Sequence, residues 1–283
     1  MFKLRFGFVF CILFSSGFVA FAHQAVPQDI ERLTTQIDQS PSAERYLERG
    51  RLWLTLSHFQ KAYEDFLFAY QHDKTNLSAV YYLGVVNLQV QNTTEALKWA
   101  KQFVATVDAS NSAALVRGNT LLGNVYVKRQ EFVLACPAYH EAWKRADPVL
   151  PEHHLNWIRC LEADRQWSEA VKAVEQSVQR SGPLVVLLQA GQGIEEQREH
   201  WAGALVWVDR MLQSGQREDV LHKERARLLL QMARYEEAAQ ALIKANEAYS
   251  RLPLMRRESQ AKQALKEEMD RLQQQIAEKT AAE

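Results

Sequence analysis

Residues 116–149 read VRGNTLLGNVYVKRQEFVLACPAYHEAWKRADPV, and one spacing in this stretch decides the fold: the aromatic Phe132 is followed three positions later by Ala135. The same spacing recurs along the chain, once with Thr93 in the aromatic place. The alanines are separated by 34, 39, 35, 34 and 34 residues, a period typical of stacked-repeat proteins. The pairs are Phe59 and Ala62, Thr93 and Ala96, Phe132 and Ala135, Trp167 and Ala170, Trp201 and Ala204, and Tyr235 and Ala238.

Each unit contains two stretches with apolar residues at helical spacing, separated by a short polar break. In the first unit, Tyr46 and Gly50 line one predicted helix, and Ala62 and Phe66 line the next. Two helix axes can approach closely only where side chains are small, and an aromatic ring can then fill the space beside the contact. The pattern therefore predicts pairs of packed helices.

The pattern resembles the tetratricopeptide repeat (TPR), a helix-turn-helix unit of 34 residues. The resemblance covers about three quarters of the chain and implies an all-α fold, a right-handed α-solenoid of helix-turn-helix repeats. The third unit matches the family pattern best, with Leu122, Gly123, Tyr126, Phe132, Ala135, Tyr139, Ala142 and Pro148 in family-like places.

Aligned on the alanines, the chain divides into a signal peptide, an N-terminal capping helix, an array of repeats and a charged C-terminal helix. The signal peptide is residues 1–22, and the capping segment is 23–42 with a short helix from Asp29 to Asp38. The C-terminal helix is 253–283. The six repeats are 43–76, 77–110, 116–149, 151–184, 185–218 and 219–252.

The fifth repeat departs from the pattern in its first helix. Gly191, Gln192 and Glu195 stand where apolar, small and aromatic residues belong, and each internal glycine costs a helix about 1 kcal/mol relative to alanine. Gly191 and Gly193 indicate either a loosened turn or hinge, or sequence drift in a tolerant array.

The N-terminus has the three parts of a secretory signal. Lys3 and Arg5 precede an apolar run, and the small residues Ala20 and Ala22 precede His23. We expect cleavage after Ala22 and an exported, periplasmic or secreted protein; an uncleaved membrane anchor is the alternative. The full chain has 34 basic and 34 acidic residues, a balance that gives no support for nucleic-acid binding.

The C-terminal helix carries a narrow apolar stripe of Leu265, Met269, Leu272 and Ile276. This spacing fits both a cap on the last repeat and a weak coiled-coil seam. We expect a cap, because terminal repeats must hide an apolar face, and a monomer or at most a weak oligomer through this helix.

No recognised catalytic motif is present in the sequence: it has no glycine-rich phosphate loop, no His-Glu-x-x-His and no Gly-x-Ser-x-Gly. We therefore predict that the protein is not an enzyme and needs no cofactor. Cys136 and His140 lie one turn apart, and His153, His154 and Cys160 follow on the next predicted helix. A metal site, a Cys136–Cys160 disulfide in an exported protein, and two buried thiols are the alternatives at this cluster.

By the family resemblance, the first helices of the repeats line a concave groove. Asn124 matches the asparagine with which some family members hold a peptide backbone, whereas Leu47 and Tyr81 stand where lysine or asparagine would complete that clamp. One interpretation is a basic groove with an apolar patch, suited to an extended segment with acidic and apolar side chains. The alternative is that these arginines only solvate the concave face and pair with Glu44, Glu152 and Glu162 nearby. The predicted partner-binding residues are Arg51, Tyr81, Val85, Leu88, Arg117, Asn124, Lys128, Arg159, Lys223 and Arg227.

These features together predict a protein-interaction scaffold or adaptor of the cell envelope. The first alternative is an accessory subunit that docks an enzyme through its convex face or C-terminal helix. The second is a metal-binding protein that uses the Cys/His cluster. Proteins with this fold bind many different partners, so the fold alone does not identify the partner of this chain.

Overall fold

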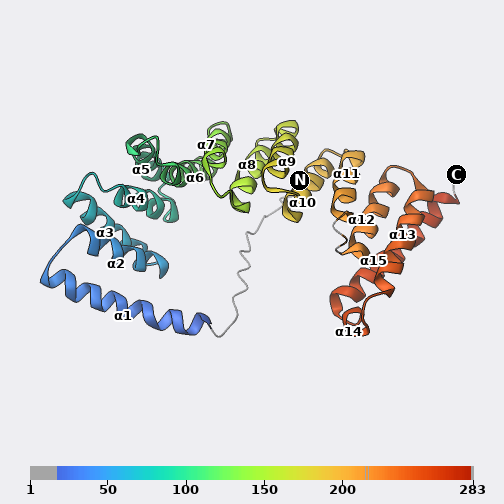
Figure 1. The fold of residues 1–283 in the computed structure, drawn as a ribbon, viewed down its shortest axis with the longest axis horizontal. Coiled ribbons are helices and arrows are strands. Elements are labelled where there is room, and N and C mark those ends of the chain that lie inside the picture. Colours follow the sequence, from blue (N-terminus) through green and yellow to red (C-terminus); the bar gives the residue numbers. More distant parts are fainter. Residues whose placement is uncertain (1–17, 214, 216, 282–283) are drawn as a thin grey trace, which may run out of the picture. The chain divides into compact units, whose positions relative to one another are not determined.

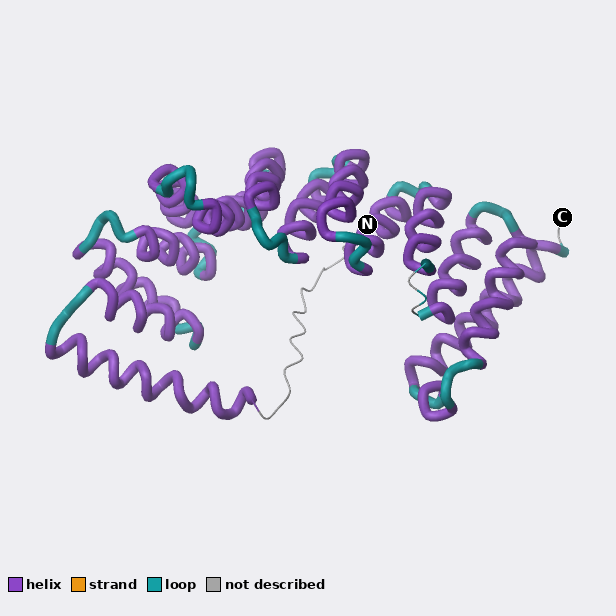
Figure 2. Tube along the Cα trace, viewed as in Figure 1, coloured by secondary structure: helices purple, strands orange, loops and turns teal. Residues whose placement is uncertain are grey.

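The computed structural model describes residues 18–213, 215 and 217–281, and in these residues α-helices alternate with short turns, with no strand (Figure 1). Figure 2 shows helices and loops only. The predicted all-α fold of helix-turn-helix repeats is confirmed. Contacts divide the chain into two compact units, one ending at Arg129 (unit 1) and one beginning at Gln130 (unit 2).

Unit 1 contains six helices among its described residues. They are α1 (Phe18–Gln39), α2 (Ala43–Thr55), α3 (Phe59–His72), α4 (Leu77–Gln89), α5 (Thr93–Thr106) and α6 (Ser112–Lys128). The boundary between the units therefore falls inside the third predicted repeat, after its first helix.

Unit 2 contains nine helices in its described part. They are α7 (Phe132–Arg145), α8 (Pro151–Ala163), α9 (Trp167–Ser181), α10 (Val185–Gln197), α11 (Trp201–Leu212), α12 (Glu218–Gln231), α13 (Tyr235–Ser250), α14 (Leu254–Arg257) and α15 (Gln260–Thr280).

The recurring aromatic or threonine marks the first residue of the second helix of each repeat, from Phe59 in α3 to Tyr235 in α13. The alanine three positions later is fully buried in all six repeats. A buried alanine lets two helices approach closely, and in five of the six repeats the paired helices pack against each other as the sequence pattern predicts. The helices of the third repeat, α6 and α7, belong to different units.

A second repeated feature is the turn between the paired helices. The residue two positions before each second helix has a positive φ between 55° and 62°, although none of these residues is glycine. Left-handed backbone costs a non-glycine residue about 1–2 kcal/mol, so helix packing must hold the turn in place. The residues are Ser57, Gln91, Gln130, Arg165, Glu199 and Ala233.

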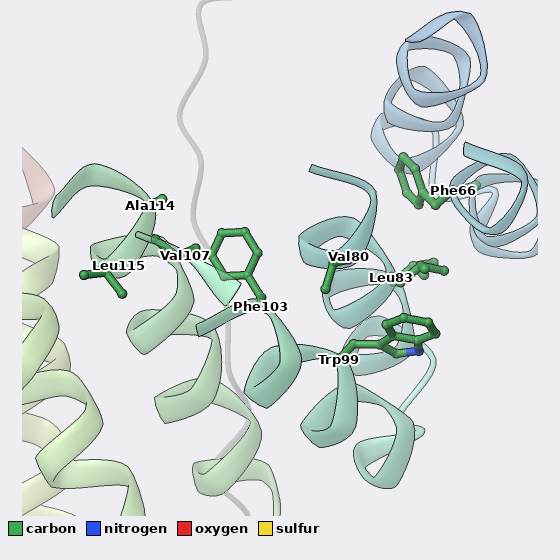
Figure 3. Close-up of a cluster of buried hydrophobic side chains, with 10 residues drawn as sticks. Phe66, Val80, Leu83, Trp99, Phe103, Val107, Ala114 and Leu115 are labelled. Atoms are coloured by element: carbon green, nitrogen blue, oxygen red, sulfur yellow. The ribbon is translucent and has the colours of Figure 1, made fainter. Parts of the chain in front are cut away.

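Unit 1 contains two clusters of buried apolar side chains, and Figure 3 shows the larger one, which runs from α3 to the start of α6. Phe66, Leu83 and Phe103 are each at most 1% exposed, and they come from three successive helices. Gly50 packs against Phe66: a Cβ added at this glycine would lie 2.6 Å from Cε1 of the ring. The glycine predicted to line α2 is therefore required by close packing.

Three predicted boundaries need correction. The first helix of the third repeat begins at Ser112 instead of Val116, because the Asn111 side chain accepts a hydrogen bond from the Ala114 N–H and starts the helix one turn earlier. The predicted helix Asp29–Asp38 is the end of a longer helix, α1, which contains Pro27 and starts in an alanine-rich stretch that favours helix. The predicted C-terminal helix is broken into α14 and α15, with an extended backbone at Ser259.

The fifth repeat has no loosened turn, since α10 runs unbroken from Val185 to Gln197. Gly191 has a packing reason: a Cβ there would lie 2.5 Å from Cε2 of Trp207. Nothing lies within 4 Å of the corresponding point at Gly193. The first glycine therefore makes room for a tryptophan, and the second meets no such constraint.

At the C-terminus, the four stripe residues of α15 are all buried, with Met269 fully so. The helix packs against α12 and α13. The stripe is thus used inside the chain and is not available as a coiled-coil seam.

At the N-terminus, most of the predicted signal peptide, residues 1–17, lies outside the described residues, and the predicted cleavage point after Ala22 falls within α1. Within the described part of the chain, none of the helices combines the length and the apolar character that a membrane span needs.

Candidate functional site

In unit 1, the first helices of successive repeats lie next to one another, with α2 in contact with α4 and α4 in contact with α6. Gly50, Gly84 and Gly118 each face a large side chain of a neighbouring helix at a distance that leaves no room for a Cβ. This close packing holds the three helices in a fixed register. Side chains on their common face can therefore act together.

That face carries two tyrosine rings, each covered by an arginine. The guanidinium carbon of Arg117 lies 5.5 Å from the Tyr81 ring centroid, and that of Arg51 lies 5.6 Å from the Tyr82 centroid. The two rings meet edge to face at 5.3 Å. Residues of α2, α4 and α6 thus form one aromatic and cationic surface, which we call the Tyr/Arg face.

The core supports the Tyr/Arg face from below. Tyr82 stacks on Phe66 at 5.0 Å, and Tyr81 contacts Phe103 at 5.3 Å. Burial raises the pKa of Tyr81 although Arg117 acts in the opposite direction, so the phenol stays protonated at neutral pH. The rings are therefore held rigidly and present uncharged faces.

The cations of this face are exposed. Arg51, Arg117 and Lys128 make no ion pair with any carboxylate in the part of the chain that the structure describes. Asn124 is half-buried and has an interaction within the chain, and Val85 and Leu88 are half-buried against Leu121 and Val125. Of the predicted residues in unit 1, the arginines, Lys128 and Tyr81 thus remain the candidates for binding.

The remaining predicted residues belong to unit 2, and two of them are already paired. Lys223 Nζ lies 2.7 Å from Glu224 Oε1 and 2.8 Å from Glu268 Oε2, and burial, which lowers the Lys223 pKa, is outweighed by these carboxylates, which raise it. Arg227 pairs with Glu196 at 2.6 Å and with Glu224 at 2.7 Å.

Sequence reasoning missed these carboxylates. Glu224 adjoins Lys223 in sequence and could have been noticed, but Glu268 comes from α15, 45 residues away. Arg159 on α8 is exposed, and its charge opposes the burial that raises the pKa of Glu162.

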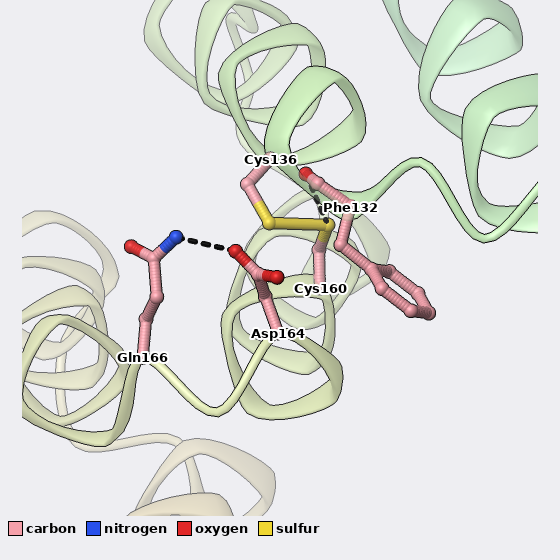
Figure 4. The surroundings of a disulfide bond; sticks show 5 residues. All are labelled: Phe132, Cys136, Cys160, Asp164 and Gln166. Carbon is pink, nitrogen blue, oxygen red and sulfur yellow. Dashed lines mark hydrogen bonds between the residues drawn. A yellow bond between two sulfur atoms is a disulfide. The ribbon is translucent and has the colours of Figure 1, made fainter.

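The Cys/His cluster is a structural junction between α7, α8 and α9. Cys136 and Cys160 are joined in a disulfide with their Cα atoms 5.4 Å apart, and the Cys160 sulfur lies beside the Phe132 carbonyl (Figure 4). His154 is fully buried: its Nδ1 accepts a hydrogen bond from Trp143 Nε1 at 2.8 Å, and its Nε2 lies 2.8 Å from the Ser181 hydroxyl.

His140 stacks on Trp157 at 4.4 Å, so this imidazole too is used in packing. No group of three or more His, Cys, Asp or Glu residues within the described ranges is arranged to hold a metal ion. The junction therefore favours a structural role over ligand binding.

No known family model matches the sequence, and no curated protein matches it. Several solved structures, by contrast, are similar to this chain in fold. The structure of YrrB, described as a TPR protein with an unusual peptide-binding site, is 17% identical, with a TM-score of 0.51 over 75% of this chain and 98% of that one.

Two further structures are similar over more of the chain. The C-terminal part of a TPR-containing protein from Cytophaga hutchinsonii has a TM-score of 0.61 at 12% identity, over 87% of this chain and 96% of that one. A TPR protein from Parabacteroides merdae has a TM-score of 0.52 at 13% identity, over 90% of this chain and 95% of that one. At such identities the similarity concerns the fold alone.

Proposed function

Since this chain has the fold of the tetratricopeptide-repeat proteins, we propose that it is a non-enzymatic scaffold that binds a segment of another protein on the Tyr/Arg face of unit 1. The resemblance in fold supports a role in protein interaction. The exposed cations and tyrosine rings of the Tyr/Arg face support this face as the binding surface.

One observation carries the proposal: Arg51 and Arg117 lie over tyrosine rings, with no carboxylate paired to them in the described residues. An exposed guanidinium can bind a carboxylate through two parallel hydrogen bonds. The tyrosine beside it offers apolar area at little entropic cost. The partner is thus an extended segment that alternates acidic with aromatic or aliphatic side chains.

The Tyr/Arg face would bind its partner as a rigid surface, with no chemical reaction. The rings are fixed by the core, so the face loses little conformational entropy when a partner binds. The exposed arginines would speed association at low salt, and the affinity would fall as salt screens them.

We place this scaffold in the cell envelope on the strength of the N-terminal signal pattern. Export predicts a mature N-terminus at His23. Intact-mass measurement of the exported protein tests this prediction. Recovery of the full-length chain in the membrane fraction would establish an uncleaved anchor instead.

The binding proposal is tested with synthetic peptides of about ten residues that alternate glutamate with phenylalanine, beside a counterpart with lysine in place of glutamate. We expect the acidic peptide to bind more tightly, and Arg117→Ala to cost roughly 1–3 kcal/mol in its affinity. The matched control is Lys101→Ala, an exposed cation on α5.

Equal affinity of wild type and Arg117→Ala would remove the Tyr/Arg face from the proposal. The second candidate function would then be an accessory subunit that docks an enzyme through the second helices of its repeats, such as α7. Val133 and Leu134 at the start of α7 favour that role, because they are 71% and 50% exposed although both are apolar.

A further inference from the structure

The chain turns from α13 into α15 through the short helix α14, and this turn carries two exposed apolar side chains (Figure 1). Leu254 is 65% exposed and Met255 is 89% exposed. No other large apolar side chain in the described residues is as exposed as Met255. Two neighbouring apolar residues at such exposure indicate an interaction surface.

The local backbone keeps these two side chains out of the core. Pro253 and Ser259, on either side of α14, have ψ values of 146° and 140°, outside the helical range, so neither α13 nor α15 continues into α14. The Tyr249 hydroxyl donates a hydrogen bond to the Arg257 carbonyl at 3.3 Å. This bond ties the end of α14 to α13, while the apolar pair at its start stays exposed.

Positive charge lies directly beside the apolar pair. Arg256 and Arg257 follow it in sequence, and neither makes an ion pair with any carboxylate in the described residues. Arg256 is exposed, and the buried Nε of Arg257 makes no hydrogen bond within the same residues. Arg251 is not counted, because two glutamates already pair with it. Glu258 is the one acid in residues 251–260, so the turn keeps a net positive charge.

We propose that α14 binds the surface of an anionic phospholipid bilayer. Leu254 and Met255 would enter the boundary between headgroups and acyl chains, and Arg256 and Arg257 would stay at the lipid phosphates. An apolar group next to a basic one matches the layers of a bilayer surface, where acyl chains lie just below negative phosphates. A guanidinium binds a phosphate through two parallel hydrogen bonds, and its aliphatic stem can lie along apolar surface.

The shape of the turn favours a bilayer over a folded protein. Figures 1 and 2 show α14 at the end of the pair formed by α13 and α15, where the chain reverses direction. Apolar side chains on such a turn need a pocket of matching shape in a protein partner, whereas lipid chains rearrange around them. A four-residue helix also offers far less than the roughly 1,200 Å² that a stable protein interface buries. We therefore expect weak and reversible membrane association.

The test is amide hydrogen exchange of residues 252–259 in the full chain, with vesicles of phosphatidylglycerol and phosphatidylcholine and with vesicles of phosphatidylcholine alone. This readout is local, so it reports on α14 even where residues 1–22 are retained and bind lipid themselves. The variants are Leu254→Gln/Met255→Gln, which removes the apolar pair, and Arg256→Gln, which removes the exposed cation.

The matched control is Val90→Gln/Val206→Gln, which removes two apolar side chains that are 51% and 50% exposed on other helices. All of these positions are on the surface, and circular dichroism checks that each variant keeps its helices.

We expect the anionic vesicles to slow exchange at α14 in wild type and control. The lipid concentration for half-maximal slowing should rise at least about tenfold in Leu254→Gln/Met255→Gln. It should rise roughly fivefold in Arg256→Gln, and rise with salt in wild type. Exchange in wild type that no vesicle slows overturns the proposal. Equal slowing by both kinds of vesicle, or in wild type and the apolar-pair variant, also overturns it, because charge or the apolar pair would then play no part.

Discussion

The first helices of unit 1 and those of unit 2 carry similar numbers of predicted groove cations, but the cations have different surroundings. In unit 1, Arg51 and Arg117 lie over tyrosine rings and pair with no carboxylate in the described residues. In unit 2, Lys223 and Arg227 are held by Glu196, Glu224 and Glu268.

The difference shows that a count of basic residues on a helix stripe does not give the charge available to a partner. A cation already paired within the chain contributes to stability, and a partner must first displace its carboxylate. Unit 1 thus offers a binding face, whereas two of the three predicted cations of unit 2 hold helices together and only Arg159 of the three is exposed. The predictions below test this division.

The disulfide gives the largest difference between the units. It closes a loop with a sequence separation of 24 residues within unit 2, and such a loop is worth about 3.5 kcal/mol in the chain-entropy model. Reduction should therefore speed amide hydrogen exchange in α7 and α8 and leave α2 to α5 unchanged. Exchange measured by mass spectrometry with and without reductant decides this. Equal effects on both units would contradict the division.

Lowering the pH should also destabilise unit 2 before unit 1, because protonation of His154 favours the unfolded state. Burial, with help from Arg180 and His153, lowers its pKa to about 4. Because the folded-state pKa lies below the ordinary value near 6.5, the stabilisation is complete above about pH 6.5 and is lost as the pH falls towards 4. The full effect is about 3 kcal/mol.

The check is the free energy of unfolding between pH 7 and pH 4 for wild type and His154→Gln. The variant should be less stable at pH 7 and should have a flatter pH profile. An unchanged slope would mean that other groups control acid unfolding.

In both units, a large side chain that packs closely against a glycine should contribute to stability in the same way. Gly191→Ala should destabilise by roughly 1–3 kcal/mol because the new Cβ meets Trp207, and Gly50→Ala should do the same against Phe66. The matched control is Gly193→Ala, which meets nothing within 4 Å and should stabilise α10 by up to about 1 kcal/mol. Chemical denaturation measures all three, and the same sign at Gly191 and Gly193 would refute the packing account.

The smallest effect concerns the cations themselves. Arg227→Gln should lower the free energy of unfolding by about 1 kcal/mol, because it breaks contacts with two carboxylates. Lys128→Gln in unit 1 should change it by less than about 0.5 kcal/mol, since Lys128 is exposed and makes no ion pair in the described residues. Denaturant melts of both variants, compared at low and high salt, test the contrast. Equal losses would mean that the two units do not differ in this respect.

The repeat pattern allowed much of the fold to be predicted. Phe59 and Tyr235 begin helices, and the alanines from Ala62 to Ala238 are buried, because a close helix contact requires small side chains at a fixed spacing. The start of α6 was misplaced by one turn, since the Asn111 cap lies outside the repeat pattern. The reason for Gly191 was also missed, because Trp207 lies on a different helix.

By itself, then, the sequence determined the helix pairs, their small-residue contacts and the candidate cations, since each depends on spacing within about one repeat. Only the tertiary structure decided which cations are free. Lys223 meets Glu268 across 45 residues, and Arg117 meets Tyr81 across a helix contact, so neither contact follows from local spacing. The tertiary structure also decided that α15 covers only part of α13, because burial along a stripe depends on the packing of helices that are distant in sequence.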